Sequence, residues 1–163
     1  MTVTTDDFIA GMRLYPGAVT AITTLCNGVR AGLTATSVCS LSAEPPQMLA
    51  CVNRAAEAHD LIVRARLFAI NLLTKSQATL ADRFAGADDC SGEARFEGAT
   101  WLAAVTGAPL LRDALVAFDC RLVALYDGAT HSILVGRVEA VHHGADGAAP
   151  LVYRASTYRT LAD

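Results

Sequence analysis

The stretch "GLTATSVCSLSAEPP", residues 32–46, combines small residues, hydroxyl side chains and a closing pair of prolines. Its one charged residue is Glu44, and its hydroxyl residues are Thr34, Thr36, Ser37, Ser40 and Ser42. Small side chains let a flat ligand approach the main chain, and backbone N–H groups at a bend, together with hydroxyls, can bind an anion without a formal positive charge. The stretch therefore permits a planar ligand that carries phosphate. A purely structural Thr/Ser strand with a proline turn accounts for the same residues.

The segments on either side of this stretch predict β-strands. Residues 18–25 are rich in β-branched side chains, and Asn27-Gly28 follows them closely. Because Asn-Gly between two strand-like runs is typical of a tight hairpin, residues 29–37 are predicted to be the returning strand. Pro45-Pro46 then stops the sheet ladder and predicts a turn, after which residues 47–53 form a short apolar strand.

Three helices are predicted from caps and apolar spacing. Thr5-Asp6-Asp7 is typical of a helix start, and Pro16-Gly17 of the end of that helix. Residues 55–66 carry apolar side chains at helical spacing, which predicts a second helix. Thr74 or Ser76 can cap a third helix that runs to about Phe84.

The remaining segments are predicted to be strands, turns and one loop. The polar segment 86–98 is predicted to be a mobile loop, and Asp127-Gly128 to open a turn. Strands are predicted at residues 67–73, 114–126, 131–141 and 150–153, with a turn at 144–147. Strands joined by hairpins, with helices interposed, favour a mainly antiparallel sheet or barrel. Because no linker or repeat interrupts the chain, residues 1–163 are predicted to form one domain.

Composition excludes several classes of protein. The chain has 163 residues, of which 53% are hydrophobic and 18% charged, so it is predicted to be globular rather than disordered. The net charge of −3 and the scattered Lys and Arg argue against a nucleic-acid surface. No segment reads as a membrane span, and the acidic start "MTVTTDDF" lacks the layout of a signal peptide, so a cytoplasmic location is expected. Five widely spaced cysteines without a C-x-x-C pair predict free thiols.

The common catalytic and nucleotide-binding motifs are missing from the sequence. It contains no G-x-G-x-x-G, no G-K-[ST] and no G-x-S-x-G. Of the four histidines, only His142 and His143 are adjacent, and neighbours in a strand face opposite sides, so no metal site is predicted. One sequence does not reveal whether a Ser-His-Asp triad forms in space.

Nearly the whole chain, from Phe8 to Leu161, resembles the short-chain flavin reductases, the small reductase components of two-component flavin monooxygenases. The segments that carry the resemblance, in the order and spacing of that family, are "YPGAVTAITT", "GLTATSVCSLSAEPPQMLACVNR", "FAINLL", "LADRFAG", "RFEGATW", "TGAPLL", "DGATHSILVGRVEAV" and "PLVYRASTY". The resemblance implies a mainly β fold with a few short helices, the split β-barrel of the FMN-binding type. It also implies a homodimer with the flavin near the subunit interface.

The same resemblance implies an activity, namely reduction of FMN or FAD by NADH or NADPH. Hydride would pass directly from C4 of the nicotinamide to N5 of the flavin, so that the cofactor supplies the chemistry and the protein the orientation. In this family the reduced flavin usually diffuses to a partner monooxygenase. Two alternatives remain open: a reductase that keeps its flavin and passes electrons to a corrinoid or ferric iron, and a flavin-binding module without enzymatic activity.

The resemblance also implies flavin-binding positions, residue by residue. The segment that wraps the flavin ring and ribityl chain corresponds to Thr34, Ala35, Thr36, Ser37, Val38 and Cys39. The end of the "VNR" strand places Asn53, Arg54 and Ala55 at the cofactor, with Arg54 facing phosphate. Many relatives carry a hydroxyl residue shortly after that basic residue, which Ala55 and Ala56 cannot supply. His59 and Asp60 open or line the following helix, at the cofactor or on a solvated helix face.

The implied reductant site involves residues from the second half of the chain. His131 corresponds to a histidine beside the nicotinamide, and we cast it as the catalytic candidate, in a positioning or proton-handling role; a hydrogen-bonded sheet histidine is the alternative. Tyr153, Arg154 and Tyr158 correspond to a region near the pyridine nucleotide or the dimer edge. Phe84 is expected either near the ligand or in the core.

Overall fold

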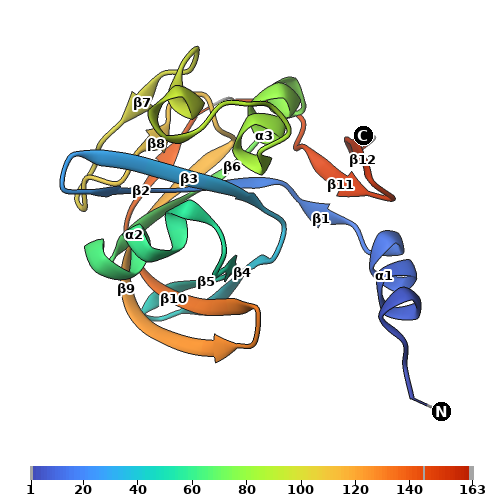
Figure 1. Ribbon diagram of the computed structural model, residues 1–163. Helices are drawn as coiled ribbons and strands as arrows, with labels where there is room; N and C mark the ends of the chain where they lie inside the picture. Colours follow the sequence, from blue (N-terminus) through green and yellow to red (C-terminus); the bar gives the residue numbers. More distant parts are fainter. Residues whose placement is uncertain (1, 145, 162–163) are drawn as a thin grey trace.

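Seven strands form one antiparallel sheet, in the order β3-β2-β6-β9-β10-β5-β4, that curls towards a barrel (Figure 1). The computed structural model describes residues 2–144 and 146–161. The strands are β2 (Thr20–Cys26), β3 (Val29–Ala35), β4 (Val38–Ala43), β5 (Pro46–Asn53), β6 (Leu67–Leu72), β9 (Val116–Gly128) and β10 (His131–His143). The expected mainly β fold with a few short helices is confirmed.

The barrel is split between β3 and β4, which stand at opposite ends of the strand order. Thr36 and Ser37 alone separate these two strands in the chain. The predicted single strand over residues 29–37 is therefore wrong at its end, because the chain leaves the sheet at Thr36 and re-enters it as β4. The stretch 32–46 thus contains the end of one edge strand, the crossing of the split and the whole of the other edge strand.

The predicted hairpins form, with one shift of position. Asn27 and Gly28 have φ angles of 51° and 81°, the left-handed pair that a two-residue hairpin turn requires, and they join β2 to β3. The turn between β4 and β5 falls at Glu44 and Pro45, and Pro46 begins β5. The turn between β9 and β10 comes later than predicted, at Ala129 and Thr130, because Asp127 and Gly128 still pair with β10.

Three helices form close to the predicted positions. They are α1 (Thr5–Leu14), α2 (Glu57–Ala65) and α3 (Ala78–Ala85), the last preceded by the 3₁₀ turn η1 (Lys75–Gln77). The side chain of Thr4 accepts a hydrogen bond from the Asp7 N–H and so caps α1. Helix α2 packs on β2 and β3, where Ala58 and Ile62 are fully buried. No helix in the described part of the chain is long and apolar enough to cross a membrane.

The segment 86–98 is more ordered than its composition predicts. It contains the 3₁₀ helix η2 (Gly92–Phe96), so the prediction of a loop is wrong there. Phe96 is buried against Phe84 and Trp101, with ring centroids 5.1 Å and 5.0 Å away. Arg30 lies 4.5 Å over the Phe96 ring and pairs with Glu93, whose pKa is held below its ordinary value mainly by that hydrogen bond. One buried aromatic ring therefore anchors an otherwise polar segment.

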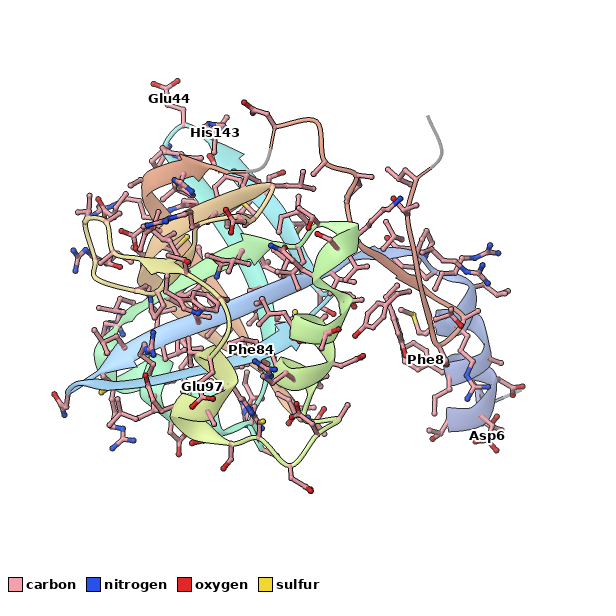
Figure 2. All side chains as sticks on the ribbon, turned by 90° about the horizontal axis from the view of Figure 1, so that it is seen from above. Asp6, Phe8, Glu44, Phe84, Glu97 and His143 are labelled. Atoms are coloured by element: carbon pink, nitrogen blue, oxygen red, sulfur yellow. The ribbon has the colours of Figure 1, made fainter. Side chains whose placement is uncertain are left out.

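A second sheet and α1 lie at one side of the molecule (Figures 1 and 2). The strands β1 (Gly17–Ala18), β11 (Val152–Arg154) and β12 (Thr157–Arg159) form it in the order β1-β11-β12, where only one strand over residues 150–153 was predicted. The short strands β7 (Trp101–Leu102) and β8 (Leu110–Leu111) form a further pair. The Ala155 N–H donates to the Arg13 carbonyl at 2.8 Å, which ties the last turn of α1 to the β11–β12 turn.

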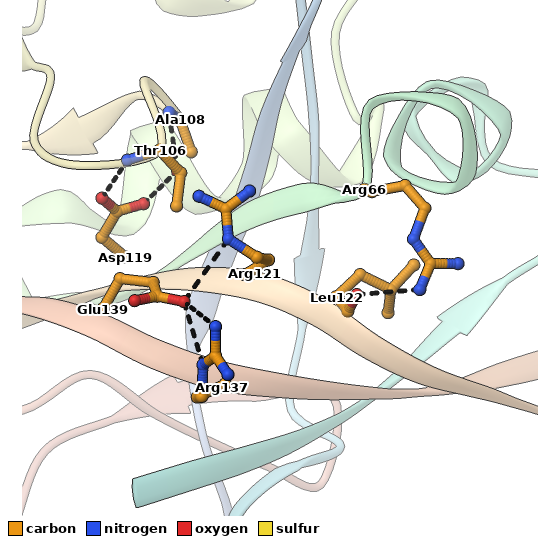
Figure 3. Close-up of polar contacts among 8 residues, drawn as sticks. All are labelled: Arg66, Thr106, Ala108, Asp119, Arg121, Leu122, Arg137 and Glu139. Atoms are coloured by element: carbon orange, nitrogen blue, oxygen red, sulfur yellow. Dashed lines mark hydrogen bonds and ion pairs between the residues drawn. The ribbon is translucent and has the colours of Figure 1, made fainter.

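Buried polar side chains fasten the connection between β7 and β9 to the sheet. Asp119 of β9 is fully buried and accepts hydrogen bonds from the N–H and the hydroxyl of Thr106 (Figure 3). Asn71 of β6, also fully buried, donates to the Ala21 carbonyl at 2.9 Å and accepts from the Leu111 N–H at 2.7 Å. On the outer surface Arg137 and Arg121 pair with Glu139, and the Arg137 hydrogen bonds hold the pKa of that carboxyl below its ordinary value (Figure 3).

Candidate functional site

Two adjoining hollows lie where the barrel is split. The larger has a volume of about 680 Å³ and is enclosed by α1, residues 36–39, β5 and the β11–β12 turn. The smaller, of about 450 Å³, lies between the end of β3, the end of α3 and the β11–β12 hairpin. Thr36, Tyr153 and Ser156 line both. Volumes of this size are typical of small-molecule sites.

Small residues bring the main chain close to the larger hollow. A Cβ added at Gly17 would lie 2.7 Å from the Thr36 Cβ, too close for any side chain larger than hydrogen. At Gly32 an added Cβ would lie 2.6 Å from the Phe84 ring, so glycine there lets α3 pack on β3. The two glycines therefore let the stretch pack closely on the chain before β2 and on α3.

The hydroxyl groups of the stretch have different tasks. Thr34 donates to the Ala81 carbonyl at 2.6 Å, so its hydroxyl ties β3 to α3. Ser42 accepts from the Glu44 N–H and shapes the turn before β5. Within the described residues the hydroxyls of Thr36 and Ser37 have no hydrogen-bond partner in the protein, and both residues line the larger hollow. Their hydroxyls are therefore available to a ligand.

Two tyrosines line the hollows: Tyr153 lines both, and Tyr158 lines the smaller one. Tyr153 and Tyr158 are opposite each other on β11 and β12, with ring centroids 5.5 Å apart at an interplanar angle of 61°. Tyr158 Oη donates to Asp82 Oδ1 at 2.8 Å. Burial, and then this carboxylate, raise the pKa of Tyr158 well above its ordinary value. Burial and the carboxylate thus favour the protonated phenol, the form that donates to Asp82.

One face of the sheet runs from the larger hollow to His131. Leu49 and Cys51 line the hollow, and Asn53 follows them on the same face of β5 because side chains alternate along a strand. His131 is the direct partner of Asn53 on β10, and directly opposite residues present their side chains on one face. His131 lines neither hollow itself, but its Nδ1 is 2.9 Å from the Thr130 hydroxyl. The sheet thus places His131 beyond Cys51 at the end of this face.

A hydrogen-bonded chain lies on the other side of the same strand ends. Asp60 Oδ1 is 2.9 Å from His59 Nδ1, and His59 Nε2 is 2.9 Å from Ser132 Oγ. Ser132 in turn is 3.3 Å from Nε of Arg54, whose Nη2 donates to Asp127 at 2.6 Å. The first three members have the order of a Ser-His-Asp triad. Ser132, however, is 2% exposed and lines neither hollow. These hydrogen bonds therefore hold Arg54 in place and do not present a nucleophile to a ligand.

The structure brings most of the predicted site residues into two groups. The group at the hollows is Thr34, Ala35, Thr36, Ser37, Val38, Cys39, Tyr153, Arg154 and Tyr158. The group at the strand ends is Asn53, Arg54, Ala55, His59, Asp60 and His131. Phe84 belongs to neither: its ring is 2% exposed and packs on Phe96 and Trp101, so of the two expected places it occupies the core.

The sequence pattern did not single out the wall formed by α1. Ile9, Met12 and Arg13 line the larger hollow together with Ser156. The amphipathic pattern of residues 5–14 indicates a helix with an apolar face, but nothing in it says where that face lies. A local signal for these residues was therefore lacking, because their place depends on contacts with the distant β11–β12 turn.

Solved structures with the same architecture identify the class. The flavin reductase component BorF of a bacterial two-component tryptophan halogenase has a TM-score of 0.88 and 30% identity, with 98% of this chain and 99% of that chain covered. The NADH:FAD oxidoreductase SgcE6 of Streptomyces globisporus C-1027, in complex with NAD and FAD fragments, has a TM-score of 0.86 and 26% identity, with 99% and 97% covered. The fold is therefore that of the split-barrel flavin reductases.

The sequence comparisons agree with the structures and are more specific. Residues 12–162 match the family described as "Flavin reductase like domain". The chain is 42% identical over 159 residues to the FMN reductase (NADH) RutF 2 of Methylorubrum extorquens strain PA1, with 98% of this chain and 91% of the relative covered. The chain belongs to the flavin reductase-like family.

The hollows fit a flavin in size and chemistry. The apolar side chains of Ile9, Met12 and Leu49 line the larger one, and a planar ring can pack against them. The main chain and the hydroxyls of Thr36 and Ser37, which have no partner among the described residues, also line it. Gly17 packs directly on Thr36, and an added Cβ would push Thr36 out of this position.

Proposed function

We propose that this NAD(P)H:flavin oxidoreductase delivers reduced flavin to a separate oxygenase. The observation that carries the proposal is the larger hollow at the split, where apolar side chains lie beside the hydroxyls of Thr36 and Ser37, which no described residue binds. The relative RutF 2 is named an FMN reductase (NADH), and BorF is the reductase component of a two-component system. The name of RutF 2 supports reduction of FMN by NADH, and the name of BorF supports a reductase that works together with a second protein.

The residues of the two groups have separate tasks in this proposal. Residues 34–39 hold the flavin through main chain and hydroxyls, while Ile9, Met12 and Tyr153 exclude water from its ring. When bound, the flavin accepts a hydride from the reduced nicotinamide nucleotide and becomes reduced flavin. Asn53 and His131, at the end of the same sheet face, orient the nicotinamide for this step. His59 and Asp60 act through Ser132 by fixing the strand ends.

An anaerobic gel-filtration experiment tests whether the reduced flavin leaves. The protein is mixed with FMN, or in a second series FAD, and excess NADH, and is then separated rapidly from small molecules. We expect the reduced flavin to elute apart from the protein, and NADH oxidation in air to rise with added flavin until it saturates. Reduced flavin that stays with the protein, with no gain from added flavin, would favour a reductase that passes its electrons to a corrinoid or ferric iron.

We further propose that the chain, folded as one domain, forms a homodimer. The apolar side chains of α1 support this, because Phe8 is 62% and Leu14 66% exposed in the single chain. Further exposed apolar residues, Leu125 and Tyr126, lie near the C-terminal end of β9. Sedimentation-velocity measurements over a range of concentrations check this proposal: a single species of about twice the chain mass is expected, and a species of chain mass throughout would contradict it.

A further inference from the structure

Among the residues that the structure describes, two cations and no carboxylate line the larger hollow. Arg13 comes from the last turn of α1, and Arg154 from the end of β11. The other lining residues are apolar or carry uncharged polar groups. In a protein with a net charge of −3, a hollow whose charged residues are both positive favours an anion.

In the described part of the chain, neither arginine is neutralised by a carboxylate. Among residues 2–144 and 146–161, no Asp or Glu lies within ion-pair distance of Arg13 or Arg154. Arg154 uses Nε to donate to the Leu14 carbonyl at 3.2 Å, which leaves its two terminal nitrogens for another partner. Arg54 differs in this respect, because Asp127 holds its Nη2 at 2.6 Å.

The fold brings these two arginines together from opposite ends of the chain. The Ala155 N–H donates to the Arg13 carbonyl at 2.8 Å, so the residue after Arg154 is bonded to Arg13 itself. A third hollow, of about 730 Å³, lies outside the split and adjoins this place. It shares Arg154 and Ala155 with the larger of the two hollows at the split, and it adds Arg159 as a further cationic residue.

We infer that Arg13 and Arg154 bind a phosphate group of a nucleotide, and that Arg159 extends this site outward. The inference rests on the proposed function, since it assigns the phosphate of the same flavin or nicotinamide nucleotide. Guanidinium groups pair with phosphate through two parallel hydrogen bonds, and such charge-assisted bonds are about twice as strong as neutral ones. The phosphate belongs either to the ribityl chain of the flavin or to the pyrophosphate of a dinucleotide.

Paired ligands with and without phosphate separate these two sources. The variants R13M, R154M and the double variant are titrated with FMN and with riboflavin, and their KM values are measured for NADH and for dihydronicotinamide riboside. We expect the double variant to bind one phosphate-bearing ligand about tenfold or more weakly than the wild type does. The phosphate-free counterpart of that ligand should bind to the double variant and to the wild type equally well. A loss for FMN alone assigns the flavin phosphate, and a loss for NADH alone assigns the pyrophosphate.

Matched variants separate this role from a purely structural one. Arg112 is exposed and lines none of the three hollows, so R112M should bind all four ligands like the wild type. Arg13 and Arg154 also lie at the C-terminal end of α1, where cations favour the helix dipole. If they serve only the helix, the double variant lowers the melting temperature and weakens riboflavin and FMN equally, and the inference is overturned. The inference is also overturned if R54M no longer binds FMN more tightly than riboflavin while the double variant still does.

A titration with inorganic pyrophosphate tests the site without any enzymatic step. Calorimetry at low ionic strength should show binding to the wild type that the double variant weakens about tenfold or more, and that R112M preserves. If the wild type neither binds flavin nor oxidises NADH, the proposed function fails, and the pyrophosphate titration still decides the inference. Equal binding of pyrophosphate by wild type and double variant, or none by either, overturns it.

Discussion

Gly17 determines how closely the chain before β2 approaches Thr36 at the split. Because an added Cβ would lie 2.7 Å from the Thr36 Cβ, Gly17→Ala must displace the side chain that lines both hollows. The displaced Thr36 hydroxyl loses its hydrogen bond to the ligand, which is worth about 0.5–1.5 kcal/mol, so we expect flavin to bind up to roughly tenfold more weakly. Fluorescence titration with FMN measures the change. Gly11→Ala is the matched control, because its added Cβ meets nothing within 4 Å; equal affinities for both variants would contradict this role of Gly17.

Tyr158 gives the molecule a dependence on alkaline pH. Its folded-state pKa is raised, chiefly by burial and then by Asp82, so folding favours the protonated phenol. The stabilisation is fully present below the pKa of about 10 that the unfolded chain shows, and is lost as pH rises above it. We therefore expect wild type to exceed Tyr158→Phe in free energy of unfolding by about 1 kcal/mol or less at pH 7, and by a shrinking margin above pH 10. Urea unfolding at pH 7, 9 and 10.5 checks this; a margin that grows with pH would be inconsistent with it.

The residues of the site differ in how far a sequence can reveal them. Thr36 and Ser37 stand within a short tract whose composition alone permits a ligand, and both line the larger hollow. Arg13 carries no such signal, because its place depends on a hydrogen bond to Ala155, far away in the chain. Arg54 was expected to face phosphate, but its pairing with Asp127 depends on how far β9 continues. Tertiary contacts, and not residue type, decide these two cases.

Strand β6 contributes a buried amide that fastens a distant connection. Asn71 binds the Ala21 carbonyl, the Thr23 hydroxyl and the Leu111 N–H. Asn71→Ala leaves these buried groups without partners, and each costs about 1–3 kcal/mol, so we expect a loss of about 3 kcal/mol in the free energy of unfolding. Urea unfolding measures it. Ser40→Ala, at an exposed position, is the control; a loss of less than about 1 kcal/mol for Asn71→Ala would show that water replaces the amide.

Elements with local signals were predicted well, and elements that depend on partners were not. Asn27-Gly28 specifies its own turn, and the hairpin formed there as predicted. The break at Thr36 and Ser37 and the new strand β4 have no comparable local signal, because β4 exists only by pairing with β5. The helix η2 was missed because its anchor, Phe96, is one ring in a polar segment, and its partners Phe84 and Trp101 lie in other elements.

For the molecule as a whole, α1 is a wall of the site and not part of the core. None of its residues is buried, yet Ile9, Met12 and Arg13 line the larger hollow. We expect a chain that begins at Tyr15 to keep the barrel, with a melting temperature within a few degrees of the wild type, and to bind FMN at least tenfold more weakly. Differential scanning fluorimetry and FMN titration check the two parts. Loss of cooperative unfolding would mean that α1 supports the barrel. An unchanged affinity for FMN would mean that α1 does not form a wall of the flavin site.

At the split, two residues connect the edge strands β3 and β4, and the same two residues line the larger hollow. A ligand held by Thr36 and Ser37 therefore restrains the last residues of β3 and the first residues of β4 at the same time. Backbone amides at the open ends of a sheet exchange their hydrogens with solvent through small local openings. Flavin should slow this exchange together in residues 33–40, on both sides of the split, while the β9–β10 turn on the far hairpin keeps its own rate. Deuterium uptake would then report whether the hollow is occupied, because a bound ligand would slow exchange in β3 and β4 together although these two strands are not paired with each other.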